Sequence, residues 1–131
     1  MKVVLDTNVV VSALLNPNGV PAQIQNLLLT DRLELLYDNR VLDEYWTVLK
    51  REKFGFSKES VDDFLRFIMF NCEFVISSPA KIKFPDEEDR KFYEVFKSGK
   101  AKYLITGNKR HYPRDAGIVS PREFIERSNL P

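Results

Sequence analysis

Asp6 is the first residue of this sequence whose type and position could support chemistry. It follows the apolar run KVVL directly, and no other acidic residue occurs before Asp31. A carboxylate among apolar neighbours is costly unless something compensates its charge. Asp6 therefore either caps a helix that begins near Asn8 or serves as a metal ligand or general base.

Glu44 is a second candidate, within a helix expected over residues 40–51. At about 100° per residue, Glu44 lies at the edge of the apolar stripe, whereas Asp43 points further toward solvent. Glu44 is thus either an acid that reaches into a cleft or an ordinary solvated helix carboxylate. The residues expected to be buried in this stripe are Val41, Leu42, Tyr45, Trp46, Val48 and Leu49.

Asp89 is the third candidate, in the acidic sequence PDEED that opens a helix expected over residues 87–98. It precedes Phe92, Tyr93 and Phe96 by three, four and seven residues, so it shares their inward side. Acids are favourable near any helix N-terminus, and Asp86 is expected to be the N-cap. That preference explains an acidic first turn but not why one acid points inward.

Thr106 and Asn108 form the fourth polar position, in a turn that follows the apolar run YLI. The simple alternative is an asparagine-containing turn without chemistry.

Alternation of strand and helix patterns indicates how these positions come together. Strands are expected over residues 2–5, 33–37, 73–76, 103–106 and 117–119, and helices over residues 8–15, 21–29, 40–51, 58–71, 87–98 and 121–127. This order predicts an α/β domain spanning residues 1–131, with a mainly parallel sheet of four to five strands covered on both faces. Ligands bind outside the carboxyl ends of such strands, where all four polar positions would meet.

Composition narrows the chemistry available at that edge. The 131 residues contain one cysteine, Cys72, and one histidine, His111, which excludes a disulfide framework and the usual Cys/His zinc sites. Three neighbouring carboxylates repel one another unless they share a proton or bind a cation. Oxygen-only ligands suit Mg²⁺ or Mn²⁺, which activate water for attack on a phosphoryl group.

No stretch approaches the roughly 18 uninterrupted apolar residues of a membrane span. We therefore expect a cytoplasmic protein that does not contact a membrane. The formal net charge of +1 means that any site for a polyanion must come from local clustering of cations.

Four sequence segments together resemble the PIN-domain family of metal-dependent ribonucleases, particularly the branch regarded as toxins of prokaryotic toxin–antitoxin pairs. The segments are LDTNVVVSALL, EYWTVLKREKF, PDEEDRKFYEVFKSGKAKYLITGNKRHYP and SPREFI, which span nearly the whole chain. The resemblance implies a three-layer α/β/α fold, an RNA substrate and an antitoxin partner.

The resemblance also assigns roles by position. It implies that Asp6, Glu44 and Asp89 hold Mg²⁺ or Mn²⁺, with Asp86 as an additional acid. The supporting polar groups that it implies are Thr7, Asn8 and Thr106. Asn108 departs from the pattern, because many members of the family have an aspartate there. An amide oxygen can coordinate a hard cation but carries no charge, which favours a single ion.

Six basic residues and no acidic residue occur between residues 97 and 114. This run brackets Asn108, so it either holds an RNA backbone beside the metal site or forms a solvated basic face. Tyr112 and His111 could stack on unpaired bases. The residues proposed to bind RNA are Lys100, Lys102, Lys109, Arg110 and Arg114.

The helix expected over residues 58–71 is apolar over more than half of its circumference. Such a helix is either an ordinary core helix or is covered by a partner, here an antitoxin or a second copy in a homodimer. Cys72 is expected to be a core residue and not a nucleophile.

The leading hypothesis is a Mg²⁺- or Mn²⁺-dependent endoribonuclease restrained by an antitoxin. One alternative is a phosphatase that forms an aspartyl phosphate at Asp6, although such enzymes usually carry a second aspartate where this chain has Asn8. The other is an RNA-binding or interaction module that has lost catalysis, which the amide at Asn108 favours.

Overall fold

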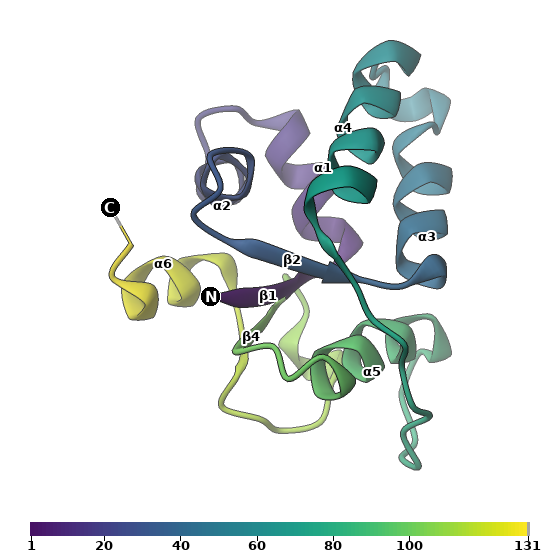
Figure 1. Ribbon diagram of the computed structural model, residues 1–131, viewed down its shortest axis with the longest axis vertical. Helices are drawn as coiled ribbons and strands as arrows, with labels where there is room; N and C mark the ends of the chain where they lie inside the picture. The colour runs from purple at the N-terminus through teal and green to yellow at the C-terminus, as the bar shows by residue number, and fades with distance from the viewer. Residues whose placement is uncertain (131) are drawn as a thin grey trace.

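A five-stranded, wholly parallel sheet forms the centre of the computed structural model, which describes residues 1–130 (Figure 1). Its strands are β1 (Lys2–Leu5), β2 (Glu34–Tyr37), β3 (Glu73–Phe74), β4 (Tyr103–Ile105) and β5 (Ile118–Val119). They lie in the order β3-β2-β1-β4-β5, which places β1 in the middle. The predicted parallel sheet is thus confirmed.

Helices cover both faces of the sheet. They are α1 (Thr7–Leu15), α2 (Val20–Leu29), α3 (Asn39–Leu49), α4 (Lys58–Asn71), α5 (Arg90–Ser98) and α6 (Pro121–Ser128). Figure 1 shows α1 to α4 on one side of the sheet and α5 on the other, while α6 packs against β4, β5 and α2. Three short 3₁₀ turns complete the fold: η1 (Glu52–Phe54), η2 (Glu87–Asp89) and η3 (Lys109–His111).

The observed element boundaries differ from the predicted ones by one or two residues, with one larger exception. The helix expected over residues 87–98 begins as the 3₁₀ turn η2, and α5 starts only at Arg90. Asp86 is the cap of η2, because its carboxylate accepts the N–H of Glu88 at 3.0 Å. The acidic first turn therefore belongs to a separate short element, which leads into α5.

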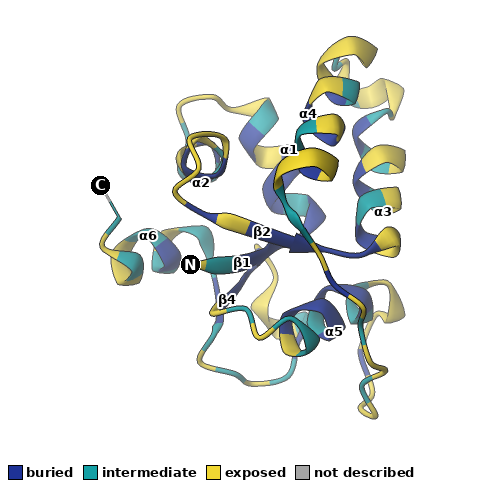
Figure 2. Cartoon of the chain, in the orientation of Figure 1, coloured by how far each residue is buried: buried dark blue, intermediate teal, exposed yellow. Residues whose placement is uncertain are grey.

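The core lies on both faces of the central strands. β1, β2 and β4 are short apolar runs buried almost completely, as expected for strands covered on two sides (Figure 2). Of the predicted α3 stripe, Val41, Tyr45 and Leu49 are buried, Leu42 and Val48 are partly buried, and Trp46 is exposed. Trp46 is 47% exposed, with the ammonium group of Lys50 4.2 Å from its ring centroid. The indole lies on the surface between α3 and α4 and not beneath α3.

The apolar helix α4 is a core helix on one side and exposes apolar side chains on another. Val61, Phe64, Leu65 and Ile68 are buried against the rest of the molecule. Met69 and Phe70, at its C-terminal end, are 49% and 82% exposed. The helix is therefore a core element that also leaves apolar side chains on the surface.

Within residues 1–130, no helix is long and apolar enough to cross a membrane.

Candidate active site

The register of β1 and β4 brings two predicted site residues together. Leu5 pairs with Ile105, so Asp6 and Thr106 leave the sheet side by side. Asp6 occupies the N-cap position of α1, but its carboxylate accepts hydrogen bonds from two hydroxyl groups. Its Oδ2 atom accepts hydrogen bonds from Thr106 at 2.8 Å and from Tyr112 at 2.9 Å. Capping of α1 is therefore not the main role of this side chain.

Burial raises the pKa of Asp6, because a charged carboxylate loses hydration there. The charge of Glu44 raises this pKa further, whereas the hydrogen bonds from Thr106 and Tyr112 lower it. The net direction is upward. The hydrogen bonds to Asp6 therefore offset only part of the cost of burying its charged form.

The turn after β4 is held by two side chains from the predicted set. The hydroxyl oxygen of Thr106, which is fully buried, accepts the backbone N–H of Asn108 at 3.0 Å. The side-chain oxygen of Asn8 accepts the N–H of Gly107 at 3.1 Å. Asn8 therefore ties the start of α1 to this turn, while the Asn108 side chain is exposed.

Glu44 projects from α3 toward the first residues of α1 and α5. Its side chain is 22% exposed, whereas Asp43 is exposed, as the helical spacing predicted. The Oε2 atom of Glu44 accepts the hydroxyl of the buried Thr7. Its Oε1 atom lies 2.8 Å from the ammonium nitrogen of Lys91, a residue that sequence reasoning did not single out.

Asp89 lies at the end of η2 and faces inward, with a side chain 15% exposed. Its carboxylate lies 3.1 Å from Nδ1 of His111, on η3. Burial raises the pKa of Asp89, and the charges of Asp6 and Asp86 raise it further. Glu87 and Glu88 are exposed, which confirms that only one acid of this segment turns inward. Asp86 is exposed as well, at the rim.

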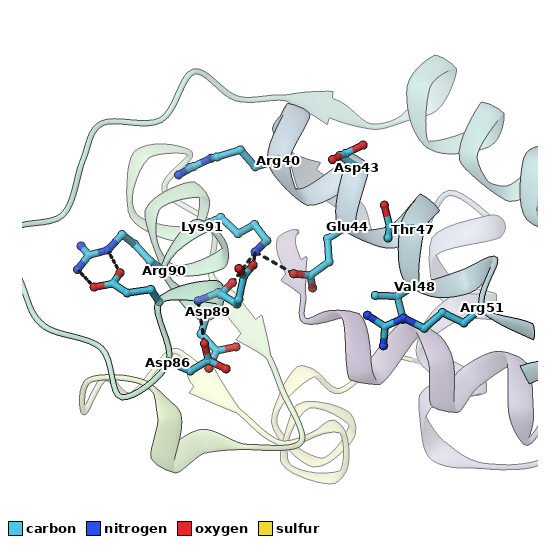
Figure 3. Close-up of a pocket in the computed structure, with 12 residues that line it drawn as sticks. Arg40, Asp43, Glu44, Thr47, Val48, Arg51, Asp86, Asp89, Arg90 and Lys91 are labelled. Carbon is cyan, nitrogen blue, oxygen red and sulfur yellow. Dashed lines mark hydrogen bonds and ion pairs between the residues drawn. The ribbon is translucent and has the colours of Figure 1, made fainter. Parts of the chain in front are cut away.

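A cleft of about 840 Å³ lies between the wall that carries Glu44 and the wall that carries Asp89 (Figure 3). Six residues of the α3 side form one wall and the segment that includes η2 forms the other. The lining residues are Arg40, Asp43, Glu44, Thr47, Val48, Arg51, Asp86, Glu87, Glu88, Asp89, Arg90 and Lys91. The cleft therefore contains the predicted acids Glu44, Asp86 and Asp89 together with several cations, whereas Asp6 does not line it.

The donor atoms suit a divalent cation in type and in charge, although they do not converge. Asp6, Glu44 and Asp89 offer only carboxylate oxygens, and the pKa values of Asp6 and Asp89 are each raised in part by a neighbouring carboxylate. Among residues 1–130, no three acidic, histidine or cysteine side chains are grouped so that they could hold a metal ion. Each carboxylate instead has a partner within the protein. We conclude that the ligand types fit and that the side chains must turn to bind.

The structure divides the predicted RNA-binding residues into two groups. Lys109, Arg110 and Arg114 line a second cavity of about 630 Å³ together with Tyr112. Lys102 lies at the other end of β4, where its N–H donates to the carbonyl of Lys2 at 2.8 Å. Thr106 follows Lys102 by four positions, or about 13 Å of strand. Lys102, and Lys100 just before it, are therefore at the opposite edge of the sheet from Asp6.

Two tyrosines have roles that differ from expectation or were not foreseen. Tyr112 was expected to stack on bases, but it is 7% exposed and donates its hydroxyl to Asp6. Burial and the nearby charge of Asp6 raise its pKa. Tyr45 is completely buried and donates its hydroxyl to the carbonyl of Leu5 at 2.5 Å. Both hydroxyls therefore support the end of β1 that carries Asp6.

The comparisons with known proteins agree with this arrangement. A sequence model of the PIN domain matches residues 2–110. An uncharacterized protein of Methanocaldococcus jannaschii is 34% identical over an alignment of 142 positions, which covers 96% of this chain and 90% of that protein. The match extends from the first residue of β1 through the turn that follows β4. This chain therefore belongs to the PIN-domain family, whose members are generally nucleases.

Proposed function

We propose that this protein is a divalent-metal-dependent endoribonuclease that uses Mg²⁺ or Mn²⁺ held by Asp6, Glu44 and Asp89. The observation that carries the proposal is the placement of three inward-facing carboxylates, from three different elements, around one edge of the sheet in a nuclease-type fold. The chemistry that such a cation supplies is polarisation of a phosphoryl oxygen and a lowered pKa of bound water.

The protein's own residues would orient these carboxylates. Thr106 and Tyr112 fix one oxygen of Asp6, Thr7 contacts one oxygen of Glu44, and His111 contacts Asp89. Groups that hydrogen-bond to metal ligands set ligand orientation and commonly change affinity or activity by 10–100-fold when removed. We therefore assign Thr7, Thr106 and Tyr112 as positioning residues. Asp86 and Asn108, both exposed at the margin, are secondary ligand candidates.

The RNA backbone is proposed to lie across the second cavity beside Tyr112. Arg110 and Arg114 supply the cations, because Lys109 already pairs with Glu123 at 2.8 Å. The position of this cavity next to Tyr112, whose hydroxyl reaches Asp6, supports a path from the cations to the carboxylates. Lys100 and Lys102 would contact RNA only if it continued to the opposite edge of the sheet.

We further propose that an antitoxin protein covers the exposed apolar residues around α3 and α4. Trp46 and Met69 line a cavity of about 520 Å³ between these helices. Phe70 and Ile76, which follow along the chain, are 82% and 88% exposed. Clustered apolar residues at a surface favour contact with another protein. A homodimer formed through the same residues is the competing outcome, and sedimentation separates the two.

The decisive experiment is cleavage of a labelled single-stranded RNA while Mn²⁺ is titrated, with wild type and Asp6→Asn compared. Asp6→Asn keeps the size of the side chain and one acceptor oxygen but removes its charge. We expect cleavage to require Mn²⁺ and to fall by at least roughly 100-fold in this variant. Circular dichroism should show that it remains folded. Equal cleavage in excess EDTA, or by Asp6→Asn, would contradict the metal site.

A second candidate function is RNA binding without catalysis. It is favoured by Asn108, where an acid is absent, and by the ion pair of Glu44 with Lys91, which neutralises one of the three carboxylates. Tight RNA binding without Mn²⁺-dependent cleavage would select this function. The phosphatase alternative loses its support, because the chain belongs to the PIN family and the Asn8 side chain is bound to Gly107.

A further inference from the structure

We propose that Lys91 is a built-in counter-cation of the carboxylate site, which holds Glu44 until a divalent metal replaces it. This inference rests on the proposed metal site and adds a positioning residue to it. In the absence of metal, Lys91 neutralises Glu44 and keeps it apart from the other carboxylates. On metal binding, Glu44 leaves Lys91, so the ammonium group and the metal compete for the same carboxylate.

The first support is the saturation of the Lys91 ammonium group. An ammonium group has three N–H donors. Its nitrogen lies 2.8 Å from Oε1 of Glu44, 3.0 Å from Oε2 of Glu88 and 2.6 Å from the carbonyl oxygen of Glu88 (Figure 3). Lys91 is only 8% exposed, and a buried charge of this kind is costly unless it is fully paired. The three contacts therefore fix the ammonium group in one place.

The second support is the state of Glu44. One of its oxygens lies 2.8 Å from the Lys91 ammonium nitrogen and the other accepts the hydroxyl of Thr7, so each oxygen already has one partner. A cation that bound Oε1 of Glu44 would therefore compete with the Lys91 ammonium group.

The third support is the alternative partner that Lys91 keeps when Glu44 leaves. The Glu88 carboxylate is 78% exposed and free to adjust, and the Glu88 carbonyl stays in reach as part of η2. The ammonium group therefore retains a counter-charge after the exchange. The side chain of Glu44 can turn toward the metal without leaving a buried unpaired cation behind.

The test is calorimetric titration of Mn²⁺, without RNA, into wild type and Lys91→Met. Removing one unit charge that competes for Glu44 should tighten Mn²⁺ binding by about tenfold and enlarge the rise in Tm that saturating Mn²⁺ produces. Lys97→Met is the matched control. Lys97 is on the same helix, but its ion pair is with Asp115, at 2.7 Å, outside the cleft. Its Mn²⁺ affinity should equal that of wild type.

A second comparison asks whether the effect passes through Glu44. In the Glu44→Gln background, Lys91→Met should change Mn²⁺ affinity by less than twofold, because the competed carboxylate is gone. A similar tenfold gain in both backgrounds would mean that Lys91 acts only through its general positive field. If Lys91→Met does not fold, Lys91→Gln, which keeps a donor for the Glu88 carbonyl, gives the same comparison.

The outcomes separate this inference from the proposed function. If wild type binds Mn²⁺ but Lys91→Met binds it equally or more weakly, Lys91 is not a competing cation and the inference fails alone. If neither protein binds Mn²⁺, the metal site and the inference both fail. Tighter binding by Lys91→Met, lost in the Glu44→Gln background, supports the exchange whatever the RNA assay shows.

Discussion

At the scale of single residues, the Asp6 carboxylate depends on two hydroxyls that belong to distant parts of the chain. Thr106 and Tyr112 both donate to the same oxygen, Oδ2. Because Asp6 is buried, its charged form relies on these donors more than an exposed carboxylate would. The hydroxyl of Tyr112 is also the structural link between the carboxylates and the basic cavity. Tyr112 is therefore the residue at which the two halves of the proposed site can be tested together.

Tyr112→Phe should lower stability and RNA cleavage without removing the ring. Losing one donor leaves the Asp6 carboxylate less satisfied and raises its pKa further, at an expected cost of about 1–3 kcal/mol in the free energy of unfolding. Urea denaturation at neutral pH measures this cost. Tyr103→Phe is the control, because Tyr103 is similarly buried but its hydroxyl has no hydrogen-bond partner within residues 1–130. Equal losses in both variants would contradict a special role for Tyr112.

The inward acids could be predicted from sequence, whereas their partners could not. Helical periodicity alone distinguishes Glu44 from Asp43 and Asp89 from Glu88, because each pair occupies one local element. Tyr112 contacts Asp6 across 106 positions of sequence, and only the folded sheet brings them together. Lys91 had one local signal, its spacing of three residues from Glu88, which is common for exposed pairs and did not indicate burial.

At the scale of elements, the two ends of β4 have different functions. The basic run was predicted as one RNA-binding segment, but β4 passes through the middle of it. Because the strand is extended, Lys102 and Thr106 emerge at opposite edges of the sheet. A charge pattern in sequence therefore overestimates the surface that can reach the carboxylates. The parallel order of the strands, in contrast, was predicted from the alternation of strands and helices and is confirmed.

The variant Arg110→Ala/Arg114→Ala should weaken RNA binding, while Lys100→Ala/Lys102→Ala should not. Both variants remove two charges, so only their position differs. Losing two phosphate contacts to single-stranded RNA should reduce the slope of log K against log salt by about 1.4. Fluorescence anisotropy at several salt concentrations measures the RNA affinity and this slope. The Asp6→Asn background prevents cleavage during the measurement. An equal loss in the two variants would place the RNA along the whole basic run.

The N-terminus of α6 predicts an acid-dependent loss of stability. Ser120 and Glu123 form a capping box there. The hydrogen bond from Lys109, followed by that from the Ser120 backbone, lowers the pKa of Glu123 to about 2. Because the folded-state pKa lies below the ordinary value of 4.5, this stabilisation is complete above about pH 4.5 and is lost as the pH falls through about 2.

Glu123→Gln should therefore lower Tm at pH 6 but flatten the fall in Tm between pH 4.5 and pH 2. Differential scanning calorimetry across this range measures the two slopes. Glu126→Gln removes an exposed carboxylate from the same helix and serves as the control. The same acid dependence in wild type and Glu123→Gln would show that the pair with Lys109 does not contribute in solution.

At the scale of the whole molecule, acidic, basic and apolar surfaces occupy separate regions. The carboxylate cleft lies between α3 and the segment that includes η2, and the cations that can reach RNA line the neighbouring cavity. The net charge of +1 conceals this division, because it sums surfaces that face different ways. The convergence of polar residues at the carboxyl ends of the strands could be predicted from topology. The division of the lining residues between two cavities could not, because it depends on contacts between residues far apart in sequence, such as that of Tyr112 with Asp6.

The apolar surface at the end of α4 gives the molecule a predicted tendency to associate. Met69 and Phe70 are exposed, so replacing both with serine should change the free energy of unfolding little. If an antitoxin normally covers them, the isolated wild-type chain should self-associate weakly as its concentration rises, and Met69→Ser/Phe70→Ser should remain monomeric. Leu29→Ser, on α2, is the control with a similarly exposed side chain. Sedimentation velocity over a hundredfold range of concentration, roughly 1–100 μM, distinguishes these outcomes. A stable dimer at every concentration would instead assign this surface to a second copy.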